Sequence, residues 1–338
     1  MKIGVIGVGV IGQRHLKHLA AHGDVEIAAV CGASEERAAD VAREYGAEPY
    51  TDYKLLFERT PLDAAFVCTP PGLRKGPVAE AAARGVACFI EKPPARTLEE
   101  ASDIADIVRN SGIVHSVGFM YRYTGAVSKA KALVEADGRT VPIARSIHVC
   151  GAGLIGAKTP KWLFDKSLSG GPLFDQAIHL MDATRYLVGK SAGEATGIHA
   201  FGGNVRRPKS DEFTVEENFV VNVSYGSGTI HAHTHSWGIA DSQAKIELLS
   251  DDYRLLVDLT RLGSRLSGHY KGEEISYHYE DENMYAEEVG VFLDAVRTGD
   301  SSLIRSSYED AARSLELVVR ANESADGRRS LTLGGTGR

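Results

Sequence analysis

The feature that most constrains this chain is a glycine-rich turn directly after its first apolar run. Residues 7–12 read Gly-Val-Gly-Val-Ile-Gly; they follow the apolar segment 2–6 and precede a helical pattern over 11–21. In such a unit the first glycine permits a tight turn, the second lets the backbone approach a pyrophosphate, and the third lets the helix pack closely on the strand. The N-terminus of the helix then faces the phosphates. We therefore predict a dinucleotide-binding turn, formed by Gly7, Gly9, Val10, Ile11 and Gly12.

Short apolar runs and amphipathic segments alternate through the first third of the chain. We expect strands at 2–6, 25–31, 64–68, 86–90 and 114–119, and helices at 11–21, 35–45, 77–84 and 97–110. The apolar runs are nearly continuous, which indicates strands that are buried on both faces, as in a parallel sheet. The alternation predicts an α/β Rossmann dinucleotide-binding domain over residues 1–121.

Beyond residue 121 the pattern changes, because strands follow one another without helices between them. We expect strands near 143–150, 194–201, 216–224, 228–237, 243–249, 253–258 and 274–279, and helices near 125–136, 172–188, 284–298 and 307–325. Consecutive strands joined by turns imply a mostly antiparallel sheet. We predict that residues 122–338 form an α+β substrate-binding and oligomerisation domain with a large open-faced sheet. Helices would cover one face, and the other would be available for a partner.

The end of the second expected strand bears on the choice of cofactor. NAD sites usually place Asp or Glu there, to bind the ribose hydroxyls, whereas this chain has Gly32. Ser34 and Arg37 could hydrogen-bond a 2′-phosphate, with a plain surface arginine as the alternative for Arg37. The pattern slightly favours NADP(H) over NAD(H).

Two further segments carry side chains suited to catalysis. Glu91, Lys92 and Pro93 end the fifth expected strand, at the edge where doubly wound sheets bind ligands. Pro93 holds Lys92 in an extended conformation, so that Lys92 would point towards a nicotinamide; a solvated lysine is the alternative. Asp175 and His179 are spaced i, i+4 on an expected helix, where a carboxylate could orient an imidazole and raise its basicity. A surface contact is the alternative for this pair.

Two neighbours of the Asp175/His179 pair have less specific interpretations. Asp182 continues the same face of the expected helix and is assigned a structural role. Trp162, in the loop before the helix, is a candidate wall of a substrate pocket, with a structural aromatic as the alternative.

The glycine turn, the Glu-Lys-Pro turn and the Gly-Gly-Pro-Leu-Phe-Asp-x-x-x-His helix occur in this order at fitting spacings. Together they resemble the Gfo/Idh/MocA family of glucose–fructose oxidoreductase, inositol dehydrogenase and rhizopine-catabolism proteins, over almost the whole chain. The resemblance implies an NAD(P)-dependent enzyme that acts on a sugar, polyol or sugar derivative, with Lys92, Asp175 and His179 at the reaction centre. It also implies a homodimer or homotetramer formed through the open sheet face.

The resemblance extends to residues on either side of the reaction centre. It places Thr69, Pro70 and Glu91 on the cofactor side and Tyr121 on the substrate side. Arg74 stands where the family often has histidine, and Met120 stands where a Gly-Phe-Asn-x-Arg segment has asparagine. Both departures concern the identity of the substrate more than the type of reaction.

Two other functions remain open from the sequence. One is a redox-assisted NAD-dependent glycosidase of the same superfamily, which oxidises its sugar only transiently. The other is a non-catalytic dinucleotide-sensing regulator, which would need the glycine turn but not Lys92, Asp175 and His179. The presence of all three favours the enzyme.

Composition excludes several classes of protein. The net charge of −7 argues against a nucleic-acid binder, and no apolar run approaches the roughly 20 residues of a membrane span. Met1 leads into a strand without a signal-peptide pattern, so we expect a cytoplasmic protein with a small-molecule substrate. Its four cysteines lack a CxxC pair and are expected to be buried, reduced thiols.

Three histidines, His231, His233 and His235, alternate along one expected strand and therefore share one face. Such imidazoles could hold zinc, but no cysteine or acid nearby in the sequence completes a ligand set. We therefore predict that they lie on an exposed or interfacial sheet face, and that the protein has no metal site.

Overall fold

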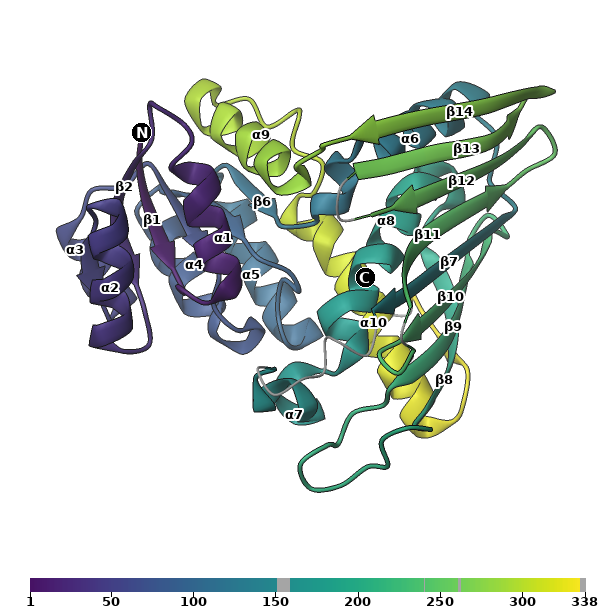
Figure 1. Ribbon diagram of the computed structural model, residues 1–338, viewed down its shortest axis with the longest axis horizontal. Coiled ribbons are helices and arrows are strands. Elements are labelled where there is room, and N and C mark those ends of the chain that lie inside the picture. The colour runs from purple at the N-terminus through teal and green to yellow at the C-terminus, as the bar shows by residue number, and fades with distance from the viewer. Residues whose placement is uncertain (151–158, 240, 261–262, 335–338) are drawn as a thin grey trace. The chain divides into compact units, whose positions relative to one another are not determined.

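Two sheets organise the chain (Figure 1). The structure, a computed structural model, describes residues 1–150, 159–239, 241–260 and 263–334. Within these ranges the chain divides into two units. The first unit combines Met1–Met120 with Met284–Arg313, and the second combines Tyr121–Asn283 with Ser314–Arg338. Part of the expected loop before Gly170, residues 151–158, lies outside the described residues.

Among the described residues, the sheet of the first unit has six strands in the order β3-β2-β1-β4-β5-β6, and every neighbouring pair is parallel. The strands are β1 (Lys2–Ile6), β2 (Glu26–Cys31), β3 (Glu48–Tyr50), β4 (Ala64–Val67), β5 (Ala87–Ile90) and β6 (His115–Val117). The helices are α1 (Val10–Leu19), α2 (Glu35–Tyr45), α3 (Tyr53–Arg59), α4 (Lys75–Ala83), α5 (Leu98–Ser111) and α9 (Met284–Thr298). The central strands are buried residue after residue, which is why their sequences are continuously apolar. The predicted Rossmann fold is confirmed.

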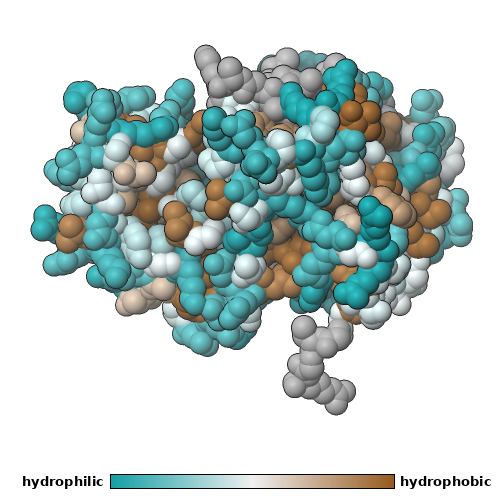
Figure 2. Space-filling view, turned by 90° about the horizontal axis from the view of Figure 1, so that it is seen from below, coloured by the Kyte–Doolittle hydropathy of each residue, from teal (hydrophilic) through white to brown (hydrophobic). Residues whose placement is uncertain are grey.

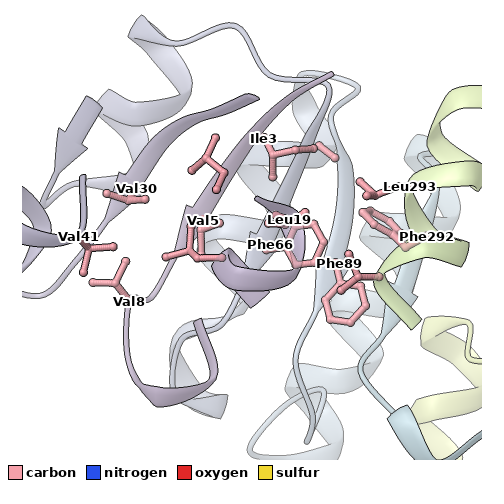
Figure 3. Close-up of a cluster of buried hydrophobic side chains, with 14 of the residues drawn as sticks. Ile3, Val5, Val8, Leu19, Val30, Val41, Phe66, Phe89, Phe292 and Leu293 are labelled. Carbon is pink, nitrogen blue, oxygen red and sulfur yellow. The ribbon is translucent and has the colours of Figure 1, made fainter. Parts of the chain in front are cut away.

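The core of the first unit includes a helix from far along the chain (Figure 3). Phe292 and Leu293 of α9 are fully buried, and the Phe292 ring lies 5.5 Å from the rings of both Phe66 and Phe89. Residues 284–313, which we expected in the second domain, therefore belong to the first unit by their contacts. The cause is the apolar stripe on α9, which is buried against β4 and β5.

The sheet of the second unit has nine strands among the described residues, in the order β14-β13-β12-β11-β7-β10-β9-β8-β15. The strands are β7 (Ile143–Cys150), β8 (Ala195–Gly203), β9 (Asn218–Tyr225), β10 (Ile230–Ser236), β11 (Ser242–Leu249), β12 (Tyr253–Leu259), β13 (Gly263–Tyr270), β14 (Glu273–Glu280) and β15 (Leu331–Thr332). Of the described strand pairs, β7–β10 is parallel and the others are antiparallel. Helices α6 (Gly125–Asp137) and α8 (Ile178–Val188) pack on one face of this sheet (Figure 1). The predicted open-faced, mostly antiparallel sheet is confirmed. Helix α10 (Tyr308–Gly327) closes the chain before β15.

Strand β13 (Gly263–Tyr270) was not expected from the sequence. It pairs along its length with β12 on one side and β14 on the other. Two of its eight residues are glycines, and few are apolar. Pairing with its two neighbours therefore stabilises β13 more than its own β-propensity does.

The prediction that the three histidines of β10 are exposed or interfacial is wrong. His231, His233 and His235 are 0%, 0% and 1% exposed. Alternation along β10 shows that they share a face but not which face is buried. That choice comes from the register with β9, which places them beside Val223, Val221 and Phe219 on the helix-covered side.

The thiols are mostly buried, and the surface combines polar and apolar residues. None of the four cysteines forms a disulfide. Cys31, Cys88 and Cys150 are buried as expected, whereas Cys68 is only half-buried. On the face shown in Figure 2, polar residues surround small apolar patches. Within the described ranges, no helix is both long enough and apolar enough to cross a membrane.

Candidate functional site

The glycine turn between β1 and α1 has a distinct requirement at each glycine. Gly7 has a φ of 99°, and a Cβ atom there would lie 2.7 Å from the backbone of Cys68. A Cβ at Gly12 would lie 1.9 Å from the carbonyl oxygen of Gly7. At Gly9 a Cβ would meet no described atom within 4 Å. Gly7 and Gly12 are therefore needed by the turn itself, whereas Gly9 leaves the backbone open to a ligand.

The N-terminus of α1 is suited to an anion. The helix begins at Val10 after Gly9, and no described side chain caps it. Its first turn contains no acidic residue, and Val10 is 74% exposed. Unpaired N–H groups and the positive end of the helix dipole favour a phosphate at this position. The residues present therefore fit the diphosphate of a dinucleotide.

The end of β2 adjoins the same turn. Ser34 caps α2 by accepting a hydrogen bond from the Arg37 backbone N–H, and Arg37 Nε donates to the carbonyl oxygen of Val8 at 3.2 Å. A Cβ at Gly32 would lie 3.0 Å from Val8 Cγ2. Close packing on Val8 thus gives a steric reason for glycine at position 32, and Arg37 is held beside the glycine turn.

The Lys92 turn is held by a buried arginine. Arg74 is 3% exposed and donates to the carbonyl oxygens of Thr69, Glu91 and Lys92. Since Thr69 follows β4 and Glu91 follows β5, one guanidinium connects the ends of both strands. The Lys92–Pro93 peptide bond in this turn is cis. Burial lowers the pKa of Arg74 to about 10, so it remains a cation at neutral pH.

The buried carboxylate of Glu91 also holds the Lys92 turn in place. His15 Nε2 donates to Glu91 Oε1 at 2.7 Å, and the Lys92 backbone N–H donates to Glu91 Oε2 at 3.0 Å. Burial alone would raise the pKa of Glu91, but the His15 hydrogen bond and the charges of Lys92 and Arg74 lower it below its ordinary value. The side chain of Glu91 thus stabilises the turn as an anion. We assigned no role to His15 from the sequence, where its signal is its place on the apolar stripe of α1 with Leu16 and Leu19.

In the second unit, a π-helical turn precedes α8. Residues 172–188 were expected as one α-helix, whereas Leu173–Ala177 (η5) is π-helical and α8 begins at Ile178. Asp175 lies in the π-helical turn and is half-buried, and His179 lies in the first turn of α8 and is 6% exposed. Single π-helical turns occur frequently at functional sites.

An aromatic side chain lies beside His179. The Tyr121 ring lies 5.5 Å from the His179 ring and 6.5 Å from the His148 ring, edge-on to both. His148 Nδ1 in turn donates to the carbonyl oxygen of Gln176 at 3.1 Å. The structure therefore brings Tyr121 and His179 together as neighbours. Trp162 is 40% exposed on the short helix η4 (Lys161–Phe164), and its pocket role stays a prediction.

A buried ion pair fixes this arrangement. Arg122 donates to both carboxylate oxygens of Asp182, at 2.8 and 2.5 Å, and the Ser314 hydroxyl donates to Asp182 Oδ1 at 2.7 Å. Arg122 follows Tyr121 directly, and Asp182 lies on α8 with His179. The pair therefore connects the two segments that carry these rings, and Asp182 has the structural role that we expected.

The predicted residues fall into two groups. The cofactor residues and Lys92 lie in the first unit, and Tyr121, Trp162, Asp175 and His179 lie in the second. The glycine turn, the end of β2 and the Lys92 turn all follow parallel strands of one sheet. This is the edge at which doubly wound sheets bind dinucleotides.

Comparisons with known proteins agree with this geometry. Residues 1–119 match the family model described as "Oxidoreductase family, NAD-binding Rossmann fold", and residues 114–256 match the "GFO/IDH/MocA C-terminal domain". The chain is 25% identical to scyllo-inositol 2-dehydrogenase (NAD(+)) of Bacillus subtilis over 335 residues, which cover 96% of this chain and 94% of that protein.

Two further similarities extend over nearly the full length. D-xylose 1-dehydrogenase (NADP(+)) 2 of Haloferax volcanii is 24% identical over 331 residues, covering 96% of this chain and 98% of that protein. The solved structure of a levoglucosan dehydrogenase, in complex with NADH and L-sorbose, superposes with a TM-score of 0.83 at 21% identity and covers 98% of both chains. The structural match establishes a shared fold across both units.

Proposed function

Because the chain belongs to the Gfo/Idh/MocA oxidoreductase family, we propose that it transfers hydride between a nicotinamide dinucleotide and a secondary alcohol or ketone of a sugar, polyol or sugar derivative. The observation that carries this proposal is the turn between β1 and α1. Gly9 is open there, and the uncapped helix N-terminus presents N–H groups to a diphosphate. The named relatives act on inositol and xylose, which supports the substrate class.

The side chains have separate roles in the proposed reaction. NAD(P), when bound, supplies the nicotinamide C4 that accepts or returns the hydride. In the oxidative direction His179 accepts the proton of the substrate hydroxyl, and Asp175 orients His179 or binds a neighbouring hydroxyl. Lys92 donates a hydrogen bond to the reacting oxygen and stabilises its developing negative charge. Arg74 and Glu91 position Lys92 through the backbone of its turn.

The finer part of the proposal is a preference for NADP(H) over NAD(H). The absence of an acid at Gly32 removes the repulsion that would exclude a 2′-phosphate. The Ser34 hydroxyl, which accepts a bond as helix cap, can still donate one, and Arg37 is held nearby by Val8. The named relatives include both an NAD(+) and an NADP(+) enzyme, so the choice depends on this chain's own residues.

Kinetics with the two cofactors test this preference. Wild type should have the higher kcat/KM with NADP, and Arg37→Gln should lower that value by about tenfold through loss of one charge-assisted bond. Arg43 is an exposed arginine later in the same helix. The control variant Arg43→Gln should leave kcat/KM unchanged for both cofactors. A wild type that prefers NAD tenfold would refute the preference and leave the reaction class unaffected.

The open face of the second sheet supports a homodimer or homotetramer. Phe201 pairs with Val220 and Ile143 pairs with Ile230 across neighbouring strands, and these side chains are 44–63% exposed. Light scattering at micromolar concentration should show an oligomer that Val220→Lys weakens. Val205→Lys, at an 87% exposed position outside the strands, should leave it intact. A monomeric wild type would contradict the proposed oligomer.

The thiols support a cytoplasmic location for the reaction. Four cysteines without a disulfide suit a reducing compartment, and we expect the enzyme to work in the cytoplasm.

A substrate screen tests the reaction itself. Absorbance of reduced nicotinamide would be followed with polyols, aldoses, sugar acids and nucleotide sugars. At least one class should give turnover with NAD or NADP. Release of sugar from a glycoside without net cofactor reduction would instead identify the glycosidase, and dinucleotide binding without turnover would identify the regulator.

A further inference from the structure

Three side chains with metal-binding atoms converge on the buried face of the second sheet. His148 and Cys150 come from β7 and His235 comes from β10. The parallel register pairs His235 with His148, and Cys150 follows two residues later on the same face. One ring nitrogen of each histidine and the cysteine sulfur lie within 4.8 Å of one another, and the three residues are 1–8% exposed. We propose that His148, Cys150 and His235 form a site for a zinc-type divalent ion.

His235 supplies an independent observation. Neither of its ring nitrogens has a hydrogen-bond partner among the described residues, although the side chain is buried. Its neighbours in the strand differ, because His231 and His233 share the Ser146 hydroxyl at 2.8 and 2.7 Å. A buried polar atom without a partner costs free energy. A metal ion bound to one ring nitrogen of His235 would satisfy that atom.

His148 is held in the form that a metal requires. The Gln176 carbonyl oxygen can only accept a hydrogen bond, so the Nδ1 atom that contacts it at 3.1 Å carries the proton. With the proton on Nδ1, Nε2 is the ring atom of His148 that can offer a lone pair to a metal. Metal-binding histidines typically donate their second ring N–H to a carbonyl or carboxylate in this way, which fixes the tautomer and the orientation of the ring.

The donor atoms determine which ion fits. Two imidazoles and a thiolate suit zinc or cobalt, whereas magnesium and calcium prefer oxygen ligands. Bonds of about 2.0–2.3 Å place the ligands of tetrahedral zinc roughly 3.3–3.7 Å apart, so binding would draw these three atoms together by no more than about 1.5 Å. Three protein ligands leave the fourth position for water or a substrate oxygen.

The surroundings of the cluster suit such an ion. Cys150 belongs to an apolar cluster with Phe213, Val215 and Trp237, which would shield the ion from solvent. Through Gln176, the cluster adjoins the turn that carries Asp175.

This inference goes beyond the proposed dehydrogenase and does not depend on it. The sequence predicted no metal site, because no cysteine lies near the histidines along the chain. The pairing of β7 with β10 removes that objection.

Cobalt titration of the chelator-treated full-length protein tests the site without cofactor or substrate. One equivalent of Co²⁺ should give the visible spectrum of tetrahedral cobalt together with a thiolate-to-cobalt charge-transfer band, and Zn²⁺ should displace it. Cys150→Ser should lose the charge-transfer band. His235→Gln should weaken binding at least tenfold.

Matched controls come from the same chain. Cys88→Ser removes another buried free thiol, and His231→Gln removes another buried histidine of β10. Both should bind cobalt as wild type does. Absence of the thiolate band in wild type would overturn the proposal, and that result needs no variant to fold. Persistence of the band in Cys150→Ser, or its equal loss in Cys88→Ser, would also overturn it.

Discussion

Replacing Asp182 with asparagine should destabilise the second unit by about 3–5 kcal/mol, because it leaves a buried guanidinium without its counter-ion. The Arg122 and Asp182 side chains are each 1% exposed. Two charge-assisted hydrogen bonds join them, at 2.8 and 2.5 Å, and Ser314 adds a third contact to the carboxylate. An asparagine keeps one acceptor but removes the charge and replaces the other acceptor with a donor.

The size of the expected loss of stability comes from the burial of the two charges, not from the presence of an ion pair alone. An exposed pair is worth about 0–1 kcal/mol, so Asp252→Asn, which breaks the Arg139–Asp252 pair of the same unit at 49% and 49% exposure, serves as the control. The double variant Arg122→Met with Asp182→Leu removes both buried charges. It should be more stable than Asp182→Asn, since an apolar pair of similar volume carries no desolvation cost.

Tryptophan fluorescence during urea unfolding measures this effect selectively. Both tryptophans of the chain, Trp162 and Trp237, lie in the second unit, so their signal reports the unfolding of that unit. A free energy of unfolding for Asp182→Asn within about 1 kcal/mol of wild type would match an exposed pair. Such a result would refute the reasoning.

Three further outcomes are expected. Lys92→Met should lower turnover about 100-fold or more while dinucleotide affinity, measured by fluorescence titration, stays nearly unchanged; near-normal turnover would remove Lys92 from the mechanism. The oxidative kcat/KM should rise with pH as the base loses its proton, and His179→Ala should abolish that rise; an unchanged profile in the variant would exclude His179. Burial lowers the pKa of His231 to about 3 and those of His233 and His235 well below their ordinary value. These neutral rings therefore stabilise the fold above pH 6.5 and cease to do so as the pH falls, by about 2 kcal/mol per histidine at pH 5. Urea unfolding at pH 7 and pH 5, with chelator present, should show this loss of stability in wild type and a smaller loss in His233→Gln. Equal losses in the two proteins would contradict the contribution assigned to His233.

The first unit was predictable because its signals are local. Continuous apolar runs identify buried parallel strands, and three glycines at fixed spacing identify the turn between β1 and α1. The unexpected part is α9, whose apolar stripe could cover either sheet as far as its own sequence shows. Its packing in the folded chain, which places Phe292 against Phe66 and Phe89, assigns it to the first unit.

The second unit depended more on contacts between distant segments. Strand β13 has little β-propensity of its own, and its pairing with β12 and β14 decides its structure. The alternation of His231, His233 and His235 along β10 was correct, but which face is buried is a property of the whole sheet. For the same reason, His148 and Cys150 could not be related to His235 before the register was known.

The residues that hold the candidate site in place were the hardest to predict from the sequence. Lys92 was identified from its place after a strand, but His15 and Arg74, which hold its turn, lie far from it along the chain. Arg122 and Asp182 are likewise separated by 60 residues. Such partners are set by tertiary structure, and one sequence contains no local pattern for them.

Isotope transfer tests the central claim most directly. The substrate found in the screen would be prepared with deuterium on its carbinol carbon and oxidised by the enzyme with NAD or NADP. The account predicts that the reduced nicotinamide carries the deuterium at C4, with one deuterium transferred for each ketone formed. Reduced cofactor without deuterium, or product formed without any reduced cofactor, would contradict hydride transfer as the reaction of this protein.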